Sequence, residues 1–251
     1  MAVNPAWFAA GGLCAAAGIS AWGATAPSSQ LFGRTVRHTG DASTIALTFD
    51  DGPNPAATPQ LLELLAKHEI EATFFLIGRQ VRAFPALARE IAGRGHEIGN
   101  HTETHPSLVW LTSSRVAEEL DRCDEAIASA AGVKARWMRP PYGYRNPLLS
   151  SVVTRRGSAG VAMWSVAARD WKTEAAEPVI ERLRRARGGD IVLLHDGDHR
   201  VAQGNRLHVV AALEYWLPRW KDSGIRFVTM SGMERNSTGI SIGTPGRAKN
   251  T

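Results

Sequence analysis

The sequence contains only two cysteines, Cys14 and Cys123, among 251 residues. Two cysteines cannot form the disulfide framework that stabilises small secreted domains. Cys123 continues a helical apolar stripe with Val116, Leu120 and Ile127, a pattern that predicts a buried core residue. The cysteine usage therefore excludes a disulfide-rich scaffold.

Long blocks of one charge are also absent. The net charge is +5 and the pI is about 9.6, but the densest basic cluster, residues 182–187, is typical of the last turn of a helix, where cations suit the dipole. No Lys/Arg arm for nucleic acid and no glycine-rich phosphate loop are present, so we expect no nucleic-acid partner and neither a nuclease nor a kinase. The positive charge either favours an anionic partner, such as a wall polymer or a membrane surface, or marks an ordinary solvated basic surface.

The chain lacks internal repeats, and its composition is that of an ordinary folded protein. Hydrophobic residues make up 44% and charged residues 21% of the sequence. A chain of this length can bury a sizeable core as one large α/β domain or two small ones.

The N-terminal segment is apolar but lacks the Lys or Arg that usually precedes the apolar region of a signal peptide. Residues 6–19 are small and apolar, and Ala24-Thr25-Ala26 offers a cleavage site before Pro27. We interpret residues 1–26 as a signal peptide or an uncleaved membrane anchor, and residues 27–42 as a polar linker. An N-terminal core helix fits less well, because the segment is apolar on all faces. The expected location is exported: secreted, periplasmic or associated with the cell envelope. Membrane contact is expected only through this segment if it stays uncleaved.

From residue 45 onward, strand patterns and helix patterns alternate. This alternation predicts a parallel sheet covered by helices. We expect a single α/β catalytic domain, residues 43–231, built as a distorted (β/α) barrel of about seven parallel strands with helices outside; a doubly wound sheet stays possible. Residues 232–251 lose periodicity and are expected to form a flexible tail. The expected strands are 45–50, 72–77, 97–100, 136–139, 161–166, 191–195 and 226–229. The expected helices are 58–68, 85–94, 113–131, 147–156, 177–187 and 207–221, with Thr112 and Gly132 as caps of the third.

Two adjacent carboxylates, Asp50 and Asp51, end the first expected strand, before Gly52-Pro53 stops it. Neighbouring strand residues point to opposite faces, so the two acids cannot do the same work from within the strand. At its end, both can still reach one cleft. Two acids in such a place favour a metal ion or a shared proton, although an N-cap and turn pair is the alternative.

A His-x-x-x-His pair, His101 and His105, follows the third expected strand. Histidines four apart on a helical turn can bind one metal ion, although the pair alone is weak evidence. With Asp51 the set becomes two imidazoles and one carboxylate, which leaves coordination positions open. An open site suits catalysis rather than structure.

Three further motifs each follow an expected strand. They are residues 139–143 (Arg-Pro-Pro-Tyr-Gly), 169–171 (Arg-Asp-Trp) and 193–197 (Leu-Leu-His-Asp-Gly). Each alone has an ordinary explanation, such as a turn or a surface ion pair. Five motifs in order, all at the carboxyl ends of strands, indicate an active site at that edge.

Together, Thr48-Phe49-Asp50-Asp51, His101 to Pro106, residues 139–143, Asp170-Trp171 and Leu193-x-His195 resemble the five ordered motifs of the polysaccharide deacetylases, the NodB-homology domains of carbohydrate esterase family four. The resemblance spans residues 45–229. It implies a distorted (β/α) barrel and metal-dependent removal of acetyl groups from sugars.

The resemblance also implies roles for individual residues. It assigns Asp51, His101 and His105 to the metal. Asp50 would be the general base on metal-bound water, with Arg139 holding it in position.

On the other side of the expected cleft, the resemblance makes His195 the general acid, paired with Asp170. The backbone N–H of Tyr142 would help to stabilise the oxyanion. Tyr142, Trp171 and Leu193 would form the acetyl pocket, with Pro141 beside them on the substrate side. One departure concerns Ala167, which stands where many members carry an additional Asp.

The first functional hypothesis is a deacetylase of N-acetylglucosamine polymers, of peptidoglycan or chitin type, acting as a monomer. The alternatives are an O-acetyl esterase on acetylated xylan and a carbohydrate-binding relic without activity. Two histidines and a carboxylate favour Zn²⁺, and Co²⁺ or another divalent ion could take the same place. His199, in the loop 197–206, could reach substrate, but nothing in the sequence requires it. Trp110 fits a sugar-stacking platform or a core indole equally well.

Overall fold

The computed structural model describes residues 5–237. Its strands are short. They are β1 (Thr35–Val36), β2 (Thr44–Asp50), β3 (Thr73–Leu76), β4 (Glu97–Asn100), β5 (Trp137–Met138), β6 (Gly160–Ala162), β7 (Val166–Ala167), β8 (Ile191–His195) and β9 (Arg226–Phe227).

The described α-helices are α1 (Pro5–Thr25), α2 (Thr58–Lys67), α3 (Gly78–Ala83), α4 (Pro85–Gly93), α5 (Ser113–Ala131), α6 (Leu149–Arg155), α7 (Ala176–Leu183), α8 (Leu207–Asp222) and α9 (Met230–Ser237). Three 3₁₀ turns accompany them: η1 (Leu108–Trp110), η2 (Pro141–Gly143) and η3 (Asp170–Lys172). None of the helices within residues 5–237 has the length and apolar character needed to cross a membrane.

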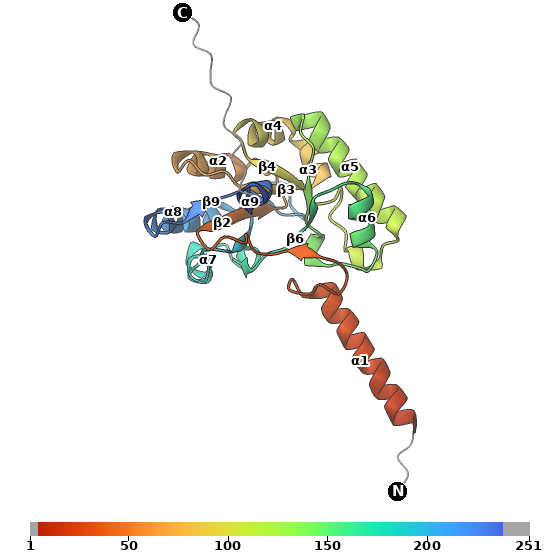
Figure 1. The fold of residues 1–251 in the computed structure, drawn as a ribbon. Helices are drawn as coiled ribbons and strands as arrows, with labels where there is room; N and C mark the ends of the chain where they lie inside the picture. The colour runs from red at the N-terminus through yellow and green to blue at the C-terminus, as the bar shows by residue number, and fades with distance from the viewer. Residues whose placement is uncertain (1–4, 238–251) are drawn as a thin grey trace, which may run out of the picture.

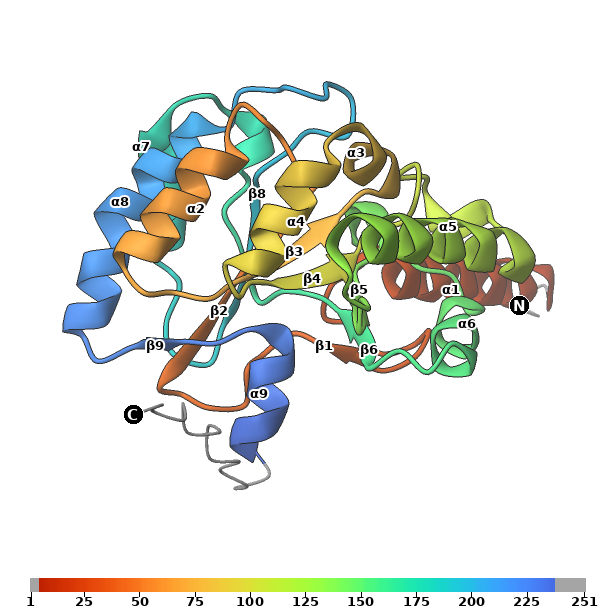
Figure 2. The ribbon, with the colours of Figure 1, turned by 90° about the horizontal axis from the view of Figure 1, so that it is seen from above.

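The sheet is a curled barrel that does not close completely. Its strand order is β1-β6-β5-β4-β3-β2-β8-β7, with β9 beside β2, and all its ladders are parallel. Within residues 5–237 no ladder joins β1 to β7, although an isolated antiparallel bridge links His38 to Asp190. Figure 2 shows the helices along the outside of the curl, whereas α1 projects away from it in Figure 1. The expected barrel-like fold is confirmed.

The strand β2 lies at the centre of this sheet, which explains its composition. It pairs with β3, β8 and β9, and all seven of its residues are buried. The main core forms where β2 and its neighbours pack against α2, α4, α5 and α8 through residues such as Phe49, Leu65, Phe74 and Leu213. Asp50, the last residue of β2, is therefore held by a strand that is buried along its whole length.

The best-defined helix, α5, has the expected bounds and caps. The Thr112 hydroxyl accepts a hydrogen bond from the Arg115 N–H, and Gly132 adopts φ +71° just after the last residue. Cys123 is buried on this helix, as predicted from its apolar stripe.

Three expectations about individual elements need correction. The strand expected at 161–166 is two strands, because β6 pairs with β5 and β1, and the chain then crosses to pair β7 with β8. Helix α7 ends at Leu183 rather than at residue 187, since 185–190 form turns held by the Asp190 carboxylate. Helix α3 was not expected.

The segments expected to lie outside the domain also contribute to it. The segment 27–42, expected to be a linker, supplies the edge strand β1, anchored by Gln30, which bonds the backbone and hydroxyl of Thr35. The expected tail begins with α9, which contributes the buried Met233 to the core, and its remainder, 238–251, lies outside the described residues.

Candidate active site

The two acids at the end of β2 lie at the edge where the parallel strands finish. The ladder places Asp50 beside His195 of β8 and beside Phe75 of β3. Asp51 follows with φ +72°, in the left-handed region that non-glycine residues rarely adopt. This turn redirects the second carboxylate, so both acids face one cleft from different sides.

Asp50 is held by a fully buried arginine. The Arg139 Nη1 group donates to Asp50 Oδ1 at 2.8 Å and to the Thr48 hydroxyl at 2.8 Å, and its Nη2 donates to the Met163 carbonyl at 3.2 Å. The guanidinium lies over the Phe75 ring, 4.2 Å from its centroid. Burial lowers the pKa of Arg139, and the adjacent Asp50 charge opposes that shift. The Arg139–Asp50 pair fixes Asp50 Oδ1 and leaves Asp50 Oδ2 free to face the cleft.

Asp51, His101 and His105 form a group whose ligand atoms all lie within 4.8 Å of one another. Asp51 Oδ1 is 3.4 Å from His101 Nε2 and 3.2 Å from His105 Nε2. This oxygen is buried and receives no hydrogen bond of good geometry from the described residues. Burial raises the pKa of Asp51, but the imidazoles of His101, His105 and His199 lower it further, to well below its usual value.

The protonation states of the two imidazoles suit a cation. His101 Nδ1 lies 2.8 Å from the Arg139 carbonyl, an acceptor, which fixes the proton on Nδ1 and leaves the Nε2 lone pair facing Asp51. Burial lowers the pKa of His105 to about 4, so its ring is neutral at ordinary pH. One carboxylate and two imidazoles are the donor set of an open divalent metal site, so these residues fit a bound ion.

His195, at the end of β8, is paired with the buried Asp170. His195 Nδ1 lies 3.0 Å from Asp170 Oδ1, and the backbone N–H of His195 donates to Asp170 Oδ2 at 2.8 Å. Burial lowers the pKa of His195, but the charge and hydrogen bond of Asp170 outweigh it and raise the pKa to about 9. The imidazole is therefore protonated at neutral pH and can donate a proton from Nε2.

These groups share a cleft of about 320 Å³. The Trp171 ring lies edge-on to His195 with centroids 5.0 Å apart, and Tyr142 lies edge-on to His105 at 4.7 Å. Leu193 also lines the cleft. Of the other residues expected at the site, Arg139 and Asp170 lie behind the residues that line the cleft, and Pro141 is buried in η2 and does not line it.

His199 is a residue of the site that the sequence pattern did not require. Its Nδ1 is 3.3 Å from Asp51 Oδ2, its ring stacks on His105 at 4.1 Å, and its Nε2 lies 3.2 Å from the Tyr142 hydroxyl. It comes from the loop before α8, where no periodicity indicates which side chains face inward. A histidine four residues after His195 was the only available signal.

The comparison with known proteins follows the same motifs. The family model described as polysaccharide deacetylase matches residues 37–161. The chain is 41% identical over 194 residues to the peptidoglycan-N-acetylglucosamine deacetylase of Bacillus cereus, covering 76% of this chain and 88% of that protein. The chain belongs to the polysaccharide deacetylase family.

Another deacetylase and one solved structure are also similar to this chain. The chitooligosaccharide deacetylase of Azorhizobium caulinodans is 38% identical over 203 residues, which cover 78% of this chain and 96% of that protein. A crystal structure from Bacillus anthracis, described as a pseudoenzyme of carbohydrate esterase family four, has a TM-score of 0.71 at 27% identity, covering 80% of this chain and 68% of that one.

As a member of the family, the chain is a polysaccharide deacetylase with a possible metal site at Asp51, His101 and His105. Ala167, the departure from the common pattern, pairs with Leu193 in the β7–β8 ladder. The Asp170 carboxylate is the partner of the His195 imidazole.

Two residues with open interpretations can now be placed. Trp110 is 87% exposed, which excludes the core interpretation. Glu103, two residues after His101, is buried, and its Oε1 lies 3.2 Å from Arg82 Nε.

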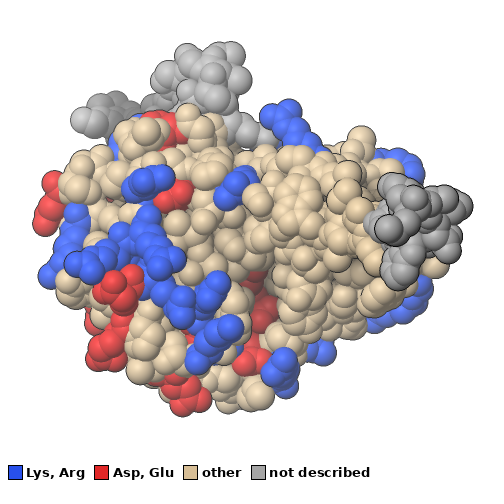
Figure 3. Space-filling model, turned by 90° about the horizontal axis from the view of Figure 1, so that it is seen from below, with Lys and Arg blue, Asp and Glu red and all other residues tan. Residues whose placement is uncertain are grey.

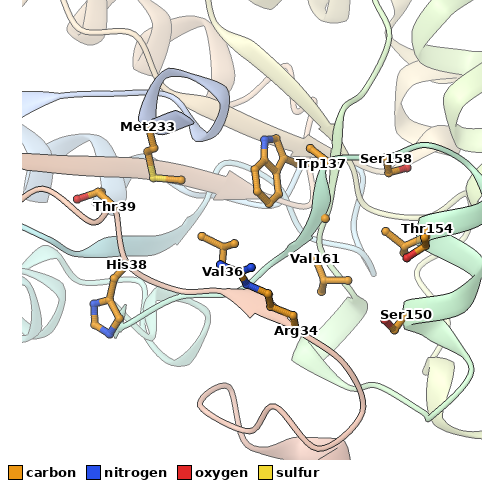
Figure 4. Close-up of a pocket in the computed structure, with 13 residues that line it drawn as sticks. Arg34, Val36, His38, Thr39, Trp137, Ser150, Thr154, Ser158, Val161 and Met233 are labelled. Atoms are coloured by element: carbon orange, nitrogen blue, oxygen red, sulfur yellow. The ribbon is translucent and has the colours of Figure 1, made fainter. Parts of the chain in front are cut away.

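A larger cavity elsewhere does not carry this chemistry. It has a volume of about 490 Å³ and lies by β1, β6 and α9, where Arg34, His38, Trp137 and Met233 line it (Figure 4). Its lining includes one histidine and no carboxylate, so it cannot supply a comparable metal site.

Proposed function

We propose that this deacetylase removes N-acetyl groups from N-acetylglucosamine-containing polysaccharide, of peptidoglycan or chitin type, and releases acetate. The observation that carries the proposal is the convergence of a candidate metal triad, an arginine-held carboxylate and a protonated histidine on one cleft of about 320 Å³. The relatives named for peptidoglycan and chitooligosaccharide deacetylation support the substrate class.

Asp51, His101 and His105 would hold the metal, and Zn²⁺ fits a set of two imidazoles and one carboxylate best. A bound divalent ion would polarise the amide carbonyl and lower the pKa of a water molecule towards neutrality. Co²⁺ is a chemically reasonable substitute. The buried Asp51 Oδ1 supports this assignment, because it faces two imidazole nitrogens and receives no hydrogen bond of good geometry from the described residues, an arrangement that a bound cation would stabilise.

Proton transfer is assigned to Asp50 and His195, which end adjacent strands. Asp50, held in place by Arg139, accepts a proton from the attacking water. His195 then donates a proton to the departing amine, and Asp170 holds the ring and supports its positive charge. An amine leaves poorly unless it is protonated, so the raised pKa of His195 suits this step.

The remaining cleft residues would position the sugar. Trp171 and Leu193 offer apolar surface for the acetyl methyl group, and Tyr142 stands at the mouth with its side chain 46% exposed. Tyr142 adopts φ +58°, a strained conformation that supports a role for its backbone N–H as an oxyanion donor. We also propose that the protein acts outside the cytoplasm, where such polymers lie, and as a monomer.

The direct test measures acetate released from chitooligosaccharides, peptidoglycan and acetylated xylan, with Zn²⁺ and with a chelator. We expect release from the N-acetylated substrates, which the chelator abolishes. Release from xylan alone would favour the O-acetyl esterase. If no substrate loses acetate at saturating metal, the protein is a carbohydrate-binding relic.

A further inference from the structure

A buried arginine fastens the end of α1 to the folded domain. The backbone N–H of Arg145 donates to the Ala24 carbonyl at 2.9 Å. Its guanidinium donates to the carbonyls of Gly23 at 3.3 Å, Ala26 at 2.5 Å and Ser29 at 3.1 Å. Arg145 is 2% exposed, so these contacts lie inside the protein rather than on its surface.

Cleavage after Ala26 would remove three of these four acceptors. The guanidinium would then bond only the Ser29 carbonyl. Burial lowers the pKa of Arg145, which shows that the folded protein already disfavours its charged form. The Arg145 donors that bonded those carbonyls would be left to solvent, so the cleaved chain would lose the contacts that order this end of the domain. The last turn of α1 therefore completes the fold, which argues against its removal.

The described side chains of α1, from residue 14 to residue 25, present mainly apolar surface to their surroundings. The sequence of Pro5–Thr25 has no charged residue. Ile19 and Trp22 are 57% and 52% exposed. Figure 1 shows the helix projecting from the body of the protein. An exposed apolar helix of this kind has to be covered by a membrane or another apolar surface.

Five arginines surround a hollow of about 750 Å³ at the base of this helix, where Pro27 and Ser28 also line it. We call this hollow the arginine pocket; its arginines are Arg37, Arg169, Arg182, Arg185 and Arg187. In Figure 3, Lys and Arg side chains gather over one part of the face seen from below.

The charges of the arginine pocket are not neutralised within residues 5–237. None of its five guanidinium groups forms an ion pair there, and Arg37 Nε is buried without a hydrogen-bond partner. The one acid in the lining, Asp190, is engaged by the Ser165 hydroxyl and the Arg187 backbone N–H. The arginine pocket therefore offers a cluster of cations that an external anion can pair.

Guanidinium groups match phosphate oxygens in geometry as well as in charge. Apolar surface next to a cluster of cations is the combination that binds anionic bilayers. We propose that α1 is retained in the working protein, and that α1 and the arginine pocket dock the enzyme on an anionic phospholipid surface, with headgroup phosphates in the pocket. This inference is independent of the deacetylase reaction.

The test uses the full chain and vesicles of phosphatidylcholine with or without about 30% phosphatidylglycerol, a content chosen to give a negative surface potential. The pocket variant is Arg182→Gln/Arg185→Gln. The matched control is Arg89→Gln/Arg184→Gln, which removes the same charge from α4 and from the segment after α7, outside the pocket. Acetate release from a soluble chitooligosaccharide checks that both variants fold.

We expect the full chain to bind anionic vesicles more tightly than neutral ones, with weaker binding at high salt. The pocket variant should lose about tenfold to thirtyfold in vesicle partition, since each cation near such a surface contributes about 1 kcal/mol. The control should lose clearly less. Equal loss in both variants, or equal binding to both kinds of vesicle, would overturn the pocket assignment. Binding of soluble glycerol phosphate polymer by the pocket with no vesicle binding would overturn the bilayer assignment.

Retention of α1 has its own measurement. Intact-mass analysis of the protein recovered from the cells that naturally make it should give a mass close to the full 27.1 kDa. A mass that corresponds to a chain beginning at Pro27 would overturn the proposal. A protein without deacetylase activity could still pass or fail both measurements, so the two hypotheses are tested separately.

Discussion

Asp50 and Asp51 are neighbours in sequence, yet they have different partners and different chemistry. Asp50 receives a charged hydrogen bond from Arg139, whereas Asp51 faces imidazole nitrogens of His101 and His105. The φ of +72° at Asp51 separates the two directions. Their roles should therefore separate by mutation.

Asp50→Asn should retain the metal and lose activity by about a hundredfold to ten-thousandfold, the usual effect of removing a general base. The asparagine carbonyl can still accept the hydrogen bond from Arg139, so the fold should survive. Elemental analysis and acetate release measure the two effects. A variant that keeps its rate would remove Asp50 as the base.

Asp51→Asn and His105→Ala should show the reverse pattern, with the metal lost first. Each removes one of the three candidate ligands of a buried site. Isothermal titration with Zn²⁺ should show affinity falling by far more than tenfold in both. If His105→Ala binds zinc like the parent chain, the triad is not the metal site.

The pH dependence of the reaction should report His195. Its pKa is raised to about 9, so the general acid is protonated below that value, and activity should fall as the pH rises through about 9. Asp170→Asn removes the cause of the raised pKa, so the alkaline limb should move towards 6.5 or lower as the rate falls. The profile of kcat/KM measures this limb, and an unmoved limb would exclude the pairing as its cause.

The same pairing affects stability, and the sign follows from the raised pKa. A group that binds its proton more tightly in the folded state stabilises the fold fully below about pH 6.5. That contribution is lost as the pH rises through about 9. Asp170→Asn should therefore flatten the decline of stability between these values in denaturant titrations.

At the scale of elements, the ends of β2 and β8 pack so closely that glycine is required. A Cβ on Gly52 would lie 2.2 Å from Asp196 Oδ2, and the Thr58 hydroxyl holds that carboxylate at 2.5 Å. Gly52→Ala should destabilise the protein by about 1–3 kcal/mol, as overpacking does. Chemical denaturation measures the change.

Two companion variants make this prediction specific. Gly93→Ala, at the end of α4, meets no atom within 4 Å and should change stability little. In an Asp196→Ala background the cost of Gly52→Ala should shrink, because the clashing carboxylate is gone. If the two substitutions change the free energy of unfolding strictly additively, the strain does not come from contact with the Asp196 carboxylate.

The ends of the central strands are also what the sequence predicts best. Apolar runs followed by polar motifs mark β2 and β8, and the His-x-x-x-His pair marks the end of β4; these ends place Asp51, His101 and His195 in one cleft. The edge strand β1 could not be predicted, since it has two residues and depends on pairing with β6 over one hundred residues away. His199 depends on loop geometry, which leaves no periodic signal.

At the scale of the whole molecule, metal binding should stabilise the folded state. A ligand that binds only the folded protein adds about 2.7 kcal/mol at one hundred times its Kd, which is about 5–10 °C in Tm for a chain of this size. Scanning calorimetry with Zn²⁺ should show this rise in the parent chain and not in His105→Ala. A rise of equal size in that variant would mean that zinc binds elsewhere.

The most direct test of the central claim measures added zinc and released acetate in one titration. Protein stripped by a chelator receives Zn²⁺ in steps, and acetate release from a chitooligosaccharide is recorded at each step. We predict no release from the stripped protein and activity that rises to a plateau at one zinc per chain. Full activity without metal, or no acetate at any zinc level from any N-acetylated substrate, would contradict the account.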